Sequence, residues 1–284
     1  MIVLTGATGT VGHHLVAELA HRDDVRAVAR SADAEQALRT SGVRDVVRAD
    51  LADPASLREA FAYADTLFLL TPPGPQQSAL DRNALEAAKD AGVRRVVYQS
   101  LYNPGPPSIA LRAWHEPAEQ WLEQSDLSWA VLQPPVFSDN LLGQLDSIRQ
   151  GQLIWPDAVG RLSHIDSRDI AAVARHALED PRLEGIVALT GPEALTYPEV
   201  AERLSRHLDI AVQHIDVPAD AFRAGAVQAG VPEAYADALV EGAAYFGAAP
   251  PYVATEAITR ATGAPARPVD DVIRDVIAPA MATA

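Results

Sequence analysis

Three observations predict an α/β fold in which helices cover both faces of a parallel sheet. Short apolar runs alternate with helix-like segments through the first half of the 284-residue chain. Hydrophobic residues make up 48% of the sequence, enough for one large domain or for a domain with a smaller cap. Glycines follow the first apolar run directly, where the chain enters a helical segment. Together these features predict a doubly wound sheet of about seven strands.

The elements follow one another in strand–helix alternation. Strands are expected at 2–5, 25–30, 43–50, 66–71, 94–100, 128–134 and, later, 185–191. Helices are expected between the first six, at 12–22, 34–42, 55–64, 79–92 and 113–125. Asp53 and Pro54 predict the N-cap and first turn of the third helix. This alternation is typical of units in which a helix connects two parallel strands.

The stretch "LTGATGTVGHHL" spaces Gly6, Gly9 and Gly12 three apart at the first strand-to-helix turn. In that context the first glycine permits a tight turn, the second lets the backbone approach a pyrophosphate, and the third allows close packing of helix on strand. The helix N-terminus then offers free N–H groups to the phosphates. We interpret the motif as a dinucleotide cradle on a Rossmann-type sheet; the alternative is three small residues in a turn.

The second strand ends in "AVARSAD", which bears on the choice of dinucleotide. An acidic residue at that place binds the ribose hydroxyls of NAD, whereas here Arg30 and Ser31 stand there. The planar guanidinium fork suits a 2′-phosphate, so the sequence favours NADP(H). Asp33 can still turn toward a ribose, so NAD(H) stays open, as does an arginine that simply ends a strand in solvent.

The alternation ends after Phe137. Thr196 and Glu199 form a capping-box pattern, and helices are expected at 200–208, 218–230, 232–246 and 268–279. We therefore expect a dinucleotide-binding domain at 1–155, completed by the strand near 185–191. A smaller, mostly helical substrate cap is expected at 192–284 with the 136–165 segment.

Composition and simple motifs exclude several classes of protein. A formal charge of −15 disfavours nucleic acid and anionic membranes as partners. The chain has no cysteine, and the adjacent His13 and His14 have no third ligand at a suitable spacing, so no metal is expected. A G-x-S-x-G elbow, a spanning segment and a secretory leader are all missing. We expect a cytoplasmic protein with a small-molecule substrate; a homodimer stays open.

The stretches "TGATGTVG", "VRAD", "LADPASL", "GVRRVVYQS" and "HIDSRDIA" together resemble the NmrA-like branch of the atypical short-chain dehydrogenases. The similarity is greatest to the NAD(P)H:quinone oxidoreductase and azoreductase-like members. It covers nearly the whole chain, although the C-terminal third matches only as a pattern of helices. The resemblance implies a Rossmann fold and an NAD(P)H-dependent oxidoreductase.

The resemblance also implies roles for individual residues. It assigns Thr8, Thr10 and Val11 to the cradle, Asp50 and Leu51 to the adenine, Thr71 to the nicotinamide ribose, and Phe137 and Asn140 to the substrate. The threonines can equally be turn formers, and Asp50 can cap a strand end. The "HIDSRD" stretch resembles one that packs Asp166 and Asp169 against neighbouring loops, so we interpret it as structural.

The Tyr-x-x-x-Lys pair of most short-chain dehydrogenases is absent. The single lysine is Lys89, and Leu85 stands four residues before it. The helix that should carry the pair instead has His115 and Glu119 one turn apart. His115 is a candidate proton donor whose pKa Glu119 can raise, the alternative being a solvated surface pair.

Other candidates lie at the carboxyl ends of the predicted strands and in the cap. Ser100 ends the fifth strand, at the edge of the sheet where ligands bind, and Tyr102 can donate to a carbonyl or stack on an aromatic ring. Cap aromatics that can complete a pocket are Trp155, Tyr245, Phe246 and Tyr252. Each of these aromatic residues can instead be part of the core.

The expected reaction is reduction of a small quinone-like or aromatic carbonyl substrate in a cleft walled by Thr71, Ser100 and Tyr102. A quinone suits a site without the Tyr–Lys pair because its reduced oxygen is acidic enough for a weak donor or water. Two alternatives stay open. One is a redox sensor that binds NAD(P) without turnover, and the other is a biosynthetic tailoring enzyme for ketone reduction, cyclisation or isomerisation.

Overall fold

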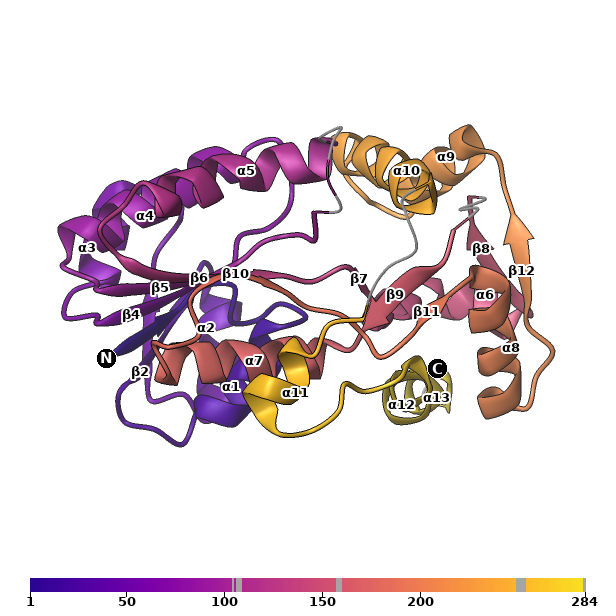
Figure 1. Ribbon diagram of the computed structural model, residues 1–284, viewed down its shortest axis with the longest axis horizontal. Helices are drawn as coiled ribbons and strands as arrows, with labels where there is room; N and C mark the ends of the chain where they lie inside the picture. Colours follow the sequence, from indigo (N-terminus) through magenta and orange to yellow (C-terminus); the bar gives the residue numbers. More distant parts are fainter. Residues whose placement is uncertain (104, 106–108, 157–159, 249–253, 283–284) are drawn as a thin grey trace.

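The computed structural model describes residues 1–103, 105, 109–156, 160–248 and 254–282. It has the predicted architecture, a sheet with helices on both faces and a smaller cap beside it (Figure 1). Among the helices in these ranges, none is long and apolar enough to span a membrane.

The central sheet has seven parallel strands in the order β10-β6-β5-β4-β1-β2-β3. All seven predicted strands are present, as β1 (Ile2–Leu4), β2 (Val25–Ala29), β3 (Asp45–Arg48), β4 (Thr66–Leu69), β5 (Arg95–Gln99), β6 (Ser128–Gln133) and β10 (Gly185–Ala188). Within the sheet, Ile2 of β1 pairs with Val25 on one side and Thr66 on the other. The strand order therefore reverses at β1, and ligands of such sheets bind beyond the carboxyl ends of the strands at that reversal.

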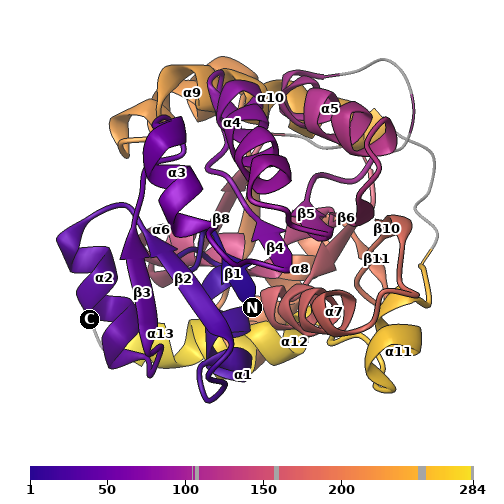
Figure 2. The same ribbon diagram turned by 90° about the vertical axis from the view of Figure 1, so that its left-hand side faces the viewer.

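Two helical layers cover the sheet (Figure 2). One face carries α1 (Gly12–Leu19), α2 (Ala32–Thr40), α7 (Ser167–Glu179) and α11 (Ala257–Thr262), and the other carries α3 (Pro54–Ala60), α4 (Gln77–Asp90) and α5 (Ala110–Glu123). Alternate strand residues face opposite layers, so Leu4 packs with the first set and Val3 with the second. Because helices cover both faces, the inner strands β1 and β4 are almost entirely apolar.

Side-chain caps fix where several helices begin. The Asp53 carboxylate accepts from the Ala55 N–H group, with Pro54 in the first turn of α3, as predicted. Thr196 and Glu199 form the predicted capping box at the start of α8 (Tyr197–Leu208). The second helix begins two residues before the predicted start because the Ser31 hydroxyl group caps it.

The cap combines helices with short strands around its own core. Its strands are β7 (Val136–Phe137), β9 (Leu162–Ile165) and β11 (Ala194–Leu195) in one sheet, and β8 (Gln152–Trp155) with β12 (Gln213–Asp216) in another. Its helices are η1 (Ser138–Gln144), α6 (Leu145–Arg149), α8, α9 (Ala219–Gln228), α10 (Glu233–Ala248), α12 (Val269–Val272), η2 (Ile273–Ile277) and α13 (Ala278–Ala282). Helices prevail after residue 192, as expected, but the 136–165 segment supplies three strands that periodicity did not indicate, since each is too short to show alternation.

Candidate active site

The glycine turn between β1 and α1 has the form of a phosphate cradle. Gly6 has a φ of +61°, and a Cβ atom there would lie 2.8 Å from Leu70. A Cβ atom on Gly12 would overlap the carbonyl group of Gly6. At Gly9, by contrast, a Cβ atom would meet only the Gly6 carbonyl oxygen, at 3.3 Å, with open space otherwise. Packing therefore requires glycine at the two outer positions, while the middle one leaves room above the turn.

The backbone of this turn presents free hydrogen-bond donors to that space. In the part of the chain that the structure describes, the N–H groups of Thr10 and Val11 have no partner. Thr8, Gly9 and Thr10 are exposed, whereas the side chain of Val11 is buried in the core. Val11 can thus contribute to the predicted cradle through its N–H group only. Free N–H groups at the start of α1 fit a pyrophosphate.

The predicted adenosine side lies where β2 and β3 end. Arg30 is exposed and forms no ion pair with a described residue, whereas Arg26 on the same strand pairs with Asp45 at 2.8 Å. The Asp50 carboxylate accepts from the Ala52 N–H group at 2.8 Å and is exposed. Leu51 packs against the second core, partly buried. An unpaired guanidinium group at this place suits an anionic ligand.

A buried chain of hydrogen bonds begins at Thr71, just after β4. Thr71 Oγ1 donates to Asp81 Oδ1 at 2.5 Å, and the Tyr98 hydroxyl group donates to Asp81 Oδ2 at 2.7 Å. The same hydroxyl group lies 2.7 Å from Nδ1 of His115, next to Gln77. Burial raises the pKa of Asp81 to about 6, against the hydrogen bonds from Thr71 and Tyr98 that favour the carboxylate.

His115 therefore differs from the cationic donor that the sequence suggests. Burial lowers the pKa of its imidazole to about 3, outweighing the raising effect of Glu119. The ring is neutral at pH 7 and its Nδ1 atom is engaged by Tyr98 and Gln77. Both expectations for His115 therefore differ from the structure. Its pKa is lowered and not raised, and its ring packs against α4 and β5 where a surface pair would be solvated.

Ser100 belongs to a second buried cluster. Its hydroxyl group donates to Glu119, whose carboxylate also accepts from Arg112 at 2.8 Å and from Gln133 at 2.9 Å. Burial acts to raise the pKa of Glu119, but the hydrogen bonds from Arg112, Ser100 and Gln133 outweigh it and lower that pKa. The Ser100 hydroxyl group, predicted to meet a substrate oxygen, is thus committed to holding α5 against the sheet. Arg112, at 2% exposure, is a cluster member that the sequence did not single out.

The remaining predicted aromatic residues of this edge lie on different elements, and the rings of Tyr245 and Phe246 are in contact, with centroids 5.3 Å apart. The Tyr102 N–H group donates to the Pro134 carbonyl group at 3.0 Å, which places Tyr102 beside the end of β6. The Tyr245 hydroxyl group donates to the Gly105 carbonyl group, joining α10 to the loop after β5. Phe246 packs against the cap core. Tyr252 lies outside the described residues.

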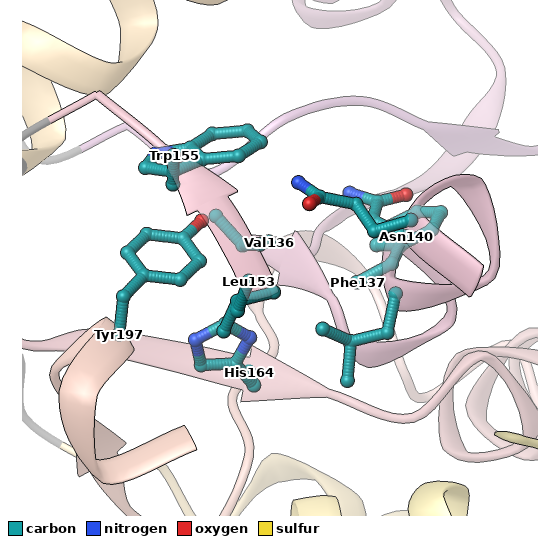
Figure 3. A pocket seen from close by; sticks show the side chains of 9 residues that line it. Val136, Phe137, Asn140, Leu153, Trp155, His164 and Tyr197 are labelled. Carbon is teal, nitrogen blue, oxygen red and sulfur yellow. The ribbon is translucent and has the colours of Figure 1, made fainter. Parts of the chain in front are cut away.

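A pocket that is partly open to solvent lies within the cap, lined by residues of β7, η1, β8, β9 and α8. Three predicted substrate residues, Phe137, Asn140 and Trp155, are among those that line it. Figure 3 shows Trp155 and Tyr197 on one side of the pocket, with Phe137 and Asn140 on the other. The other lining residues, which sequence reasoning missed, are Val136, Leu141, Gln144, Leu153, His164 and Tyr197.

Two of the missed residues stood in motifs that had another explanation. His164 begins the "HIDSRD" stretch, which we interpreted as structural, and its aspartates do have structural roles: Asp166 caps α7 and Asp169 pairs with Arg267. Tyr197 follows the capping threonine of α8. The sequence shows only that His164 and Tyr197 each stand beside a structural motif. The fold brings the two side chains to the same pocket. No cluster of three or more potential metal ligands occurs among the described residues.

The fold and this site define an NAD(P)H-binding protein built on a Rossmann-type sheet. A family model described as NAD(P)H-binding matches residues 6–181, more than half of the chain, and the chain belongs to that family. The expectation of an NAD(P)H-binding protein is confirmed at this level.

Several of the relatives that the chain resembles are named as reductases. It is 34% identical over 273 residues to an NAD(P)H azoreductase from Xenophilus azovorans, covering 94% of both chains. It is 33% identical over 280 residues to (4-alkanoyl-5-oxo-2,5-dihydrofuran-3-yl)methyl phosphate reductase from Streptomyces griseus, covering 95% of this chain and 96% of the relative. A solved NADPH-dependent quinone oxidoreductase from Escherichia coli, complexed with NADPH, matches with a TM-score of 0.84 and 26% identity over 96% of this chain and 98% of that one. These relatives confirm the resemblance seen in the sequence.

Proposed function

We propose that this protein is an NADPH-dependent oxidoreductase that reduces a small quinone-like or aromatic carbonyl compound. The observation that carries the proposal is the position and lining of the pocket. Phe137 and Asn140 belong to the part of the cap that follows β6, a strand that ends at the same edge of the sheet as the glycine turn. Trp155 and Tyr197 line the pocket from other elements of the cap. An apolar, aromatic pocket with few polar groups suits a planar, weakly polar substrate.

The residues proposed to hold the cofactor are Gly6, Thr8, Gly9, Thr10, Val11, Gly12, Arg30, Ser31, Asp50, Leu51 and Thr71. When bound, NADPH supplies a hydride. The free N–H groups of the turn bind the pyrophosphate, and Arg30 binds the 2′-phosphate that distinguishes NADPH from NADH. Because Ser31 Oγ already accepts from the Ala34 N–H group, its hydroxyl hydrogen is what it can offer to a phosphate.

Reduction of a quinone to a hydroquinone takes one hydride and one proton. Since burial keeps His115 neutral and Ser100 is engaged by Glu119, we assign the proton to Tyr102, which lies beside the end of β6. Tyr102→Phe should slow a ketone-like substrate about 10²–10⁴-fold, the usual contribution of a positioned acid. A quinone should slow much less, because its reduced oxygen can take the proton from water. Equal rates for wild type and variant on both substrates would remove Tyr102 from this role.

Steady-state NADPH oxidation followed at 340 nm tests the reaction, with a naphthoquinone, an azo dye and an aromatic ketone as substrates. Sustained NADPH consumption with equimolar hydroquinone supports the proposal. NADPH binding without consumption would favour a redox sensor instead. The Streptomyces griseus relative, named as a reductase of an oxo-dihydrofuran phosphate, adds an unsaturated lactone to the panel. A product of unchanged oxidation state would indicate a tailoring enzyme.

Three further parts of the proposal concern the organisation of the protein. We place the dinucleotide-binding domain at 1–155 with the strand near 185–191, and the substrate cap at 192–284 with 136–165. We place the protein in the cytoplasm, in line with a chain that has no cysteine. We also propose a homodimer, for which light scattering should give twice the chain mass of 30.3 kDa.

A further inference from the structure

His164 lies on β9 with a side chain that nothing so far explains. Its exposure is 3%, and in the described part of the chain neither ring nitrogen has a hydrogen-bond partner. Burial lowers the pKa of the imidazole to about 4, so at pH 7 the neutral ring offers one N–H donor and one lone pair. Leaving such groups unsatisfied in a protein interior is destabilising, and native structures rarely do so without a reason.

The neighbouring histidine of the same aromatic cluster, His214, has a hydrogen-bond partner. His214 stacks on Tyr197 with ring centroids 5.8 Å apart, and its Nε2 atom lies 3.2 Å from the Trp155 carbonyl oxygen. His164 meets Tyr197 edge-on, also at 5.8 Å, but lines the pocket and lacks such a partner (Figure 3). Both rings contact Tyr197, but only the His164 ring lines the pocket.

The two side-chain amide groups of the pocket are occupied or lie at its rim. The Gln144 amide group donates to the Ile154 carbonyl group at 2.5 Å and accepts from the Ile154 N–H group at 2.9 Å. Asn140 is exposed at the rim. Trp155 Nε1 is a second buried atom of the lining without a hydrogen-bond partner among the described residues, but an indole N–H group can only donate. The His164 ring offers both a donor and an acceptor to a planar ring in the pocket.

We propose that His164 is the specificity-determining residue of this pocket, and that it selects planar aromatic substrates carrying an oxygen substituent on the end of the ring that enters the cap. The inference rests on the proposed function, because it assumes that the substrate of that reaction fills the pocket. A neutral imidazole can donate to a carbonyl oxygen through its N–H group or accept from a hydroxyl group through its lone pair. It can thus pair with the carbonyl group of a quinone and with the hydroxyl group of a phenol. A lysine ammonium group can only donate and a carboxylate can only accept, so neither would serve both substrates.

The test compares 2-naphthol with 2-methylnaphthalene, two ligands of nearly equal shape that differ by a hydroxyl and a methyl group. Affinities are measured by calorimetry on the wild-type protein and on His164→Phe, with His164→Leu as a second apolar variant. His214→Phe is the matched control, a histidine of the same cluster outside the pocket lining. Unchanged circular dichroism and unchanged NADPH affinity identify the variants that fold.

The wild type should prefer the naphthol about tenfold, the effect of satisfying one buried polar group. The apolar His164 variants should lose this preference, His164→Asn should keep part of it, and His214→Phe should keep it in full. A preference that survives in a folded apolar variant, or wild-type protein that binds neither ligand, overturns the inference. NADPH oxidation with 1,4-naphthoquinone is measured on the same samples. Turnover with no role for His164 refutes the inference alone, whereas a His164-dependent preference without any turnover refutes the proposed reaction alone.

Discussion

Replacing His164 with phenylalanine should make the protein less sensitive to acid. The pKa of His164 falls from 6.5 to about 4 on burial, so as the pH drops the unfolded chain takes up a proton before the folded one does. The stability that the neutral ring retains above pH 6.5 is therefore lost progressively as the pH falls toward 4. Between pH 7.5 and 4.5 the two pKa values give a loss of about 2.5 kcal/mol from this one residue. His164→Phe cannot take up that proton, so the loss should disappear from its stability profile.

Urea denaturation of both proteins at a series of pH values from 7.5 to 4.5 measures the effect. Other groups titrate in this range: burial raises the pKa of Asp81 to about 6 and lowers that of His115 to about 3. Both are present in wild type and variant, so the difference between the two profiles isolates His164. His21→Gln, at an exposed position, is the control and should leave the profile unchanged. If the free energies of unfolding of wild type and His164→Phe change in parallel with pH, burial does not lower the pKa of His164, and the argument fails.

Further predictions concern the cofactor site and the two buried clusters. Arg30→Ala should weaken NADPH binding about ten- to a hundredfold and leave NADH nearly unchanged, since a charge-assisted contact contributes about 1.5–3 kcal/mol; equal affinities for the two cofactors in the wild type would contradict this. Gly9→Val should fold, because its Cβ atom would meet only the Gly6 carbonyl oxygen, at 3.3 Å, yet lose dinucleotide binding by calorimetry; a folded variant that still binds would overturn the cradle. Arg112→Ala should cost about 3–5 kcal/mol in urea denaturation by leaving the Glu119 carboxylate buried and unpaired, and a cost below 1 kcal/mol would contradict the cluster. His115→Ala should leave NADPH affinity unchanged and slow a ketone no more than a quinone; selective loss of the ketone reaction would restore it as the donor.

The sequence by itself determined the parallel sheet and its glycine turn. Seven apolar runs became seven strands, and Asp53 and Thr196 cap the helices that they were predicted to cap, although α8 begins three residues before the expected range. The reason is that these signals are local. Strand length, capping and a tight turn depend on neighbours within a few residues, and the family match over 6–181 follows the same local pattern.

Only the tertiary structure decided what the candidate catalytic residues face. His115 and Glu119 are one turn apart on α5, yet one ring is enclosed by Tyr98 and Gln77 while the other side chain holds Arg112. The pocket likewise joins residues from β7, η1, β8, β9 and α8, which are separated by up to sixty-one positions from Val136 to Tyr197. Desolvation and hydrogen bonding are set by the atoms around a group in space, whatever its neighbours in sequence. For that reason the sequence could name an ionisable residue on a helix, but its charge, its partner and its access to a substrate depended on the packing of α4, α5 and the cap.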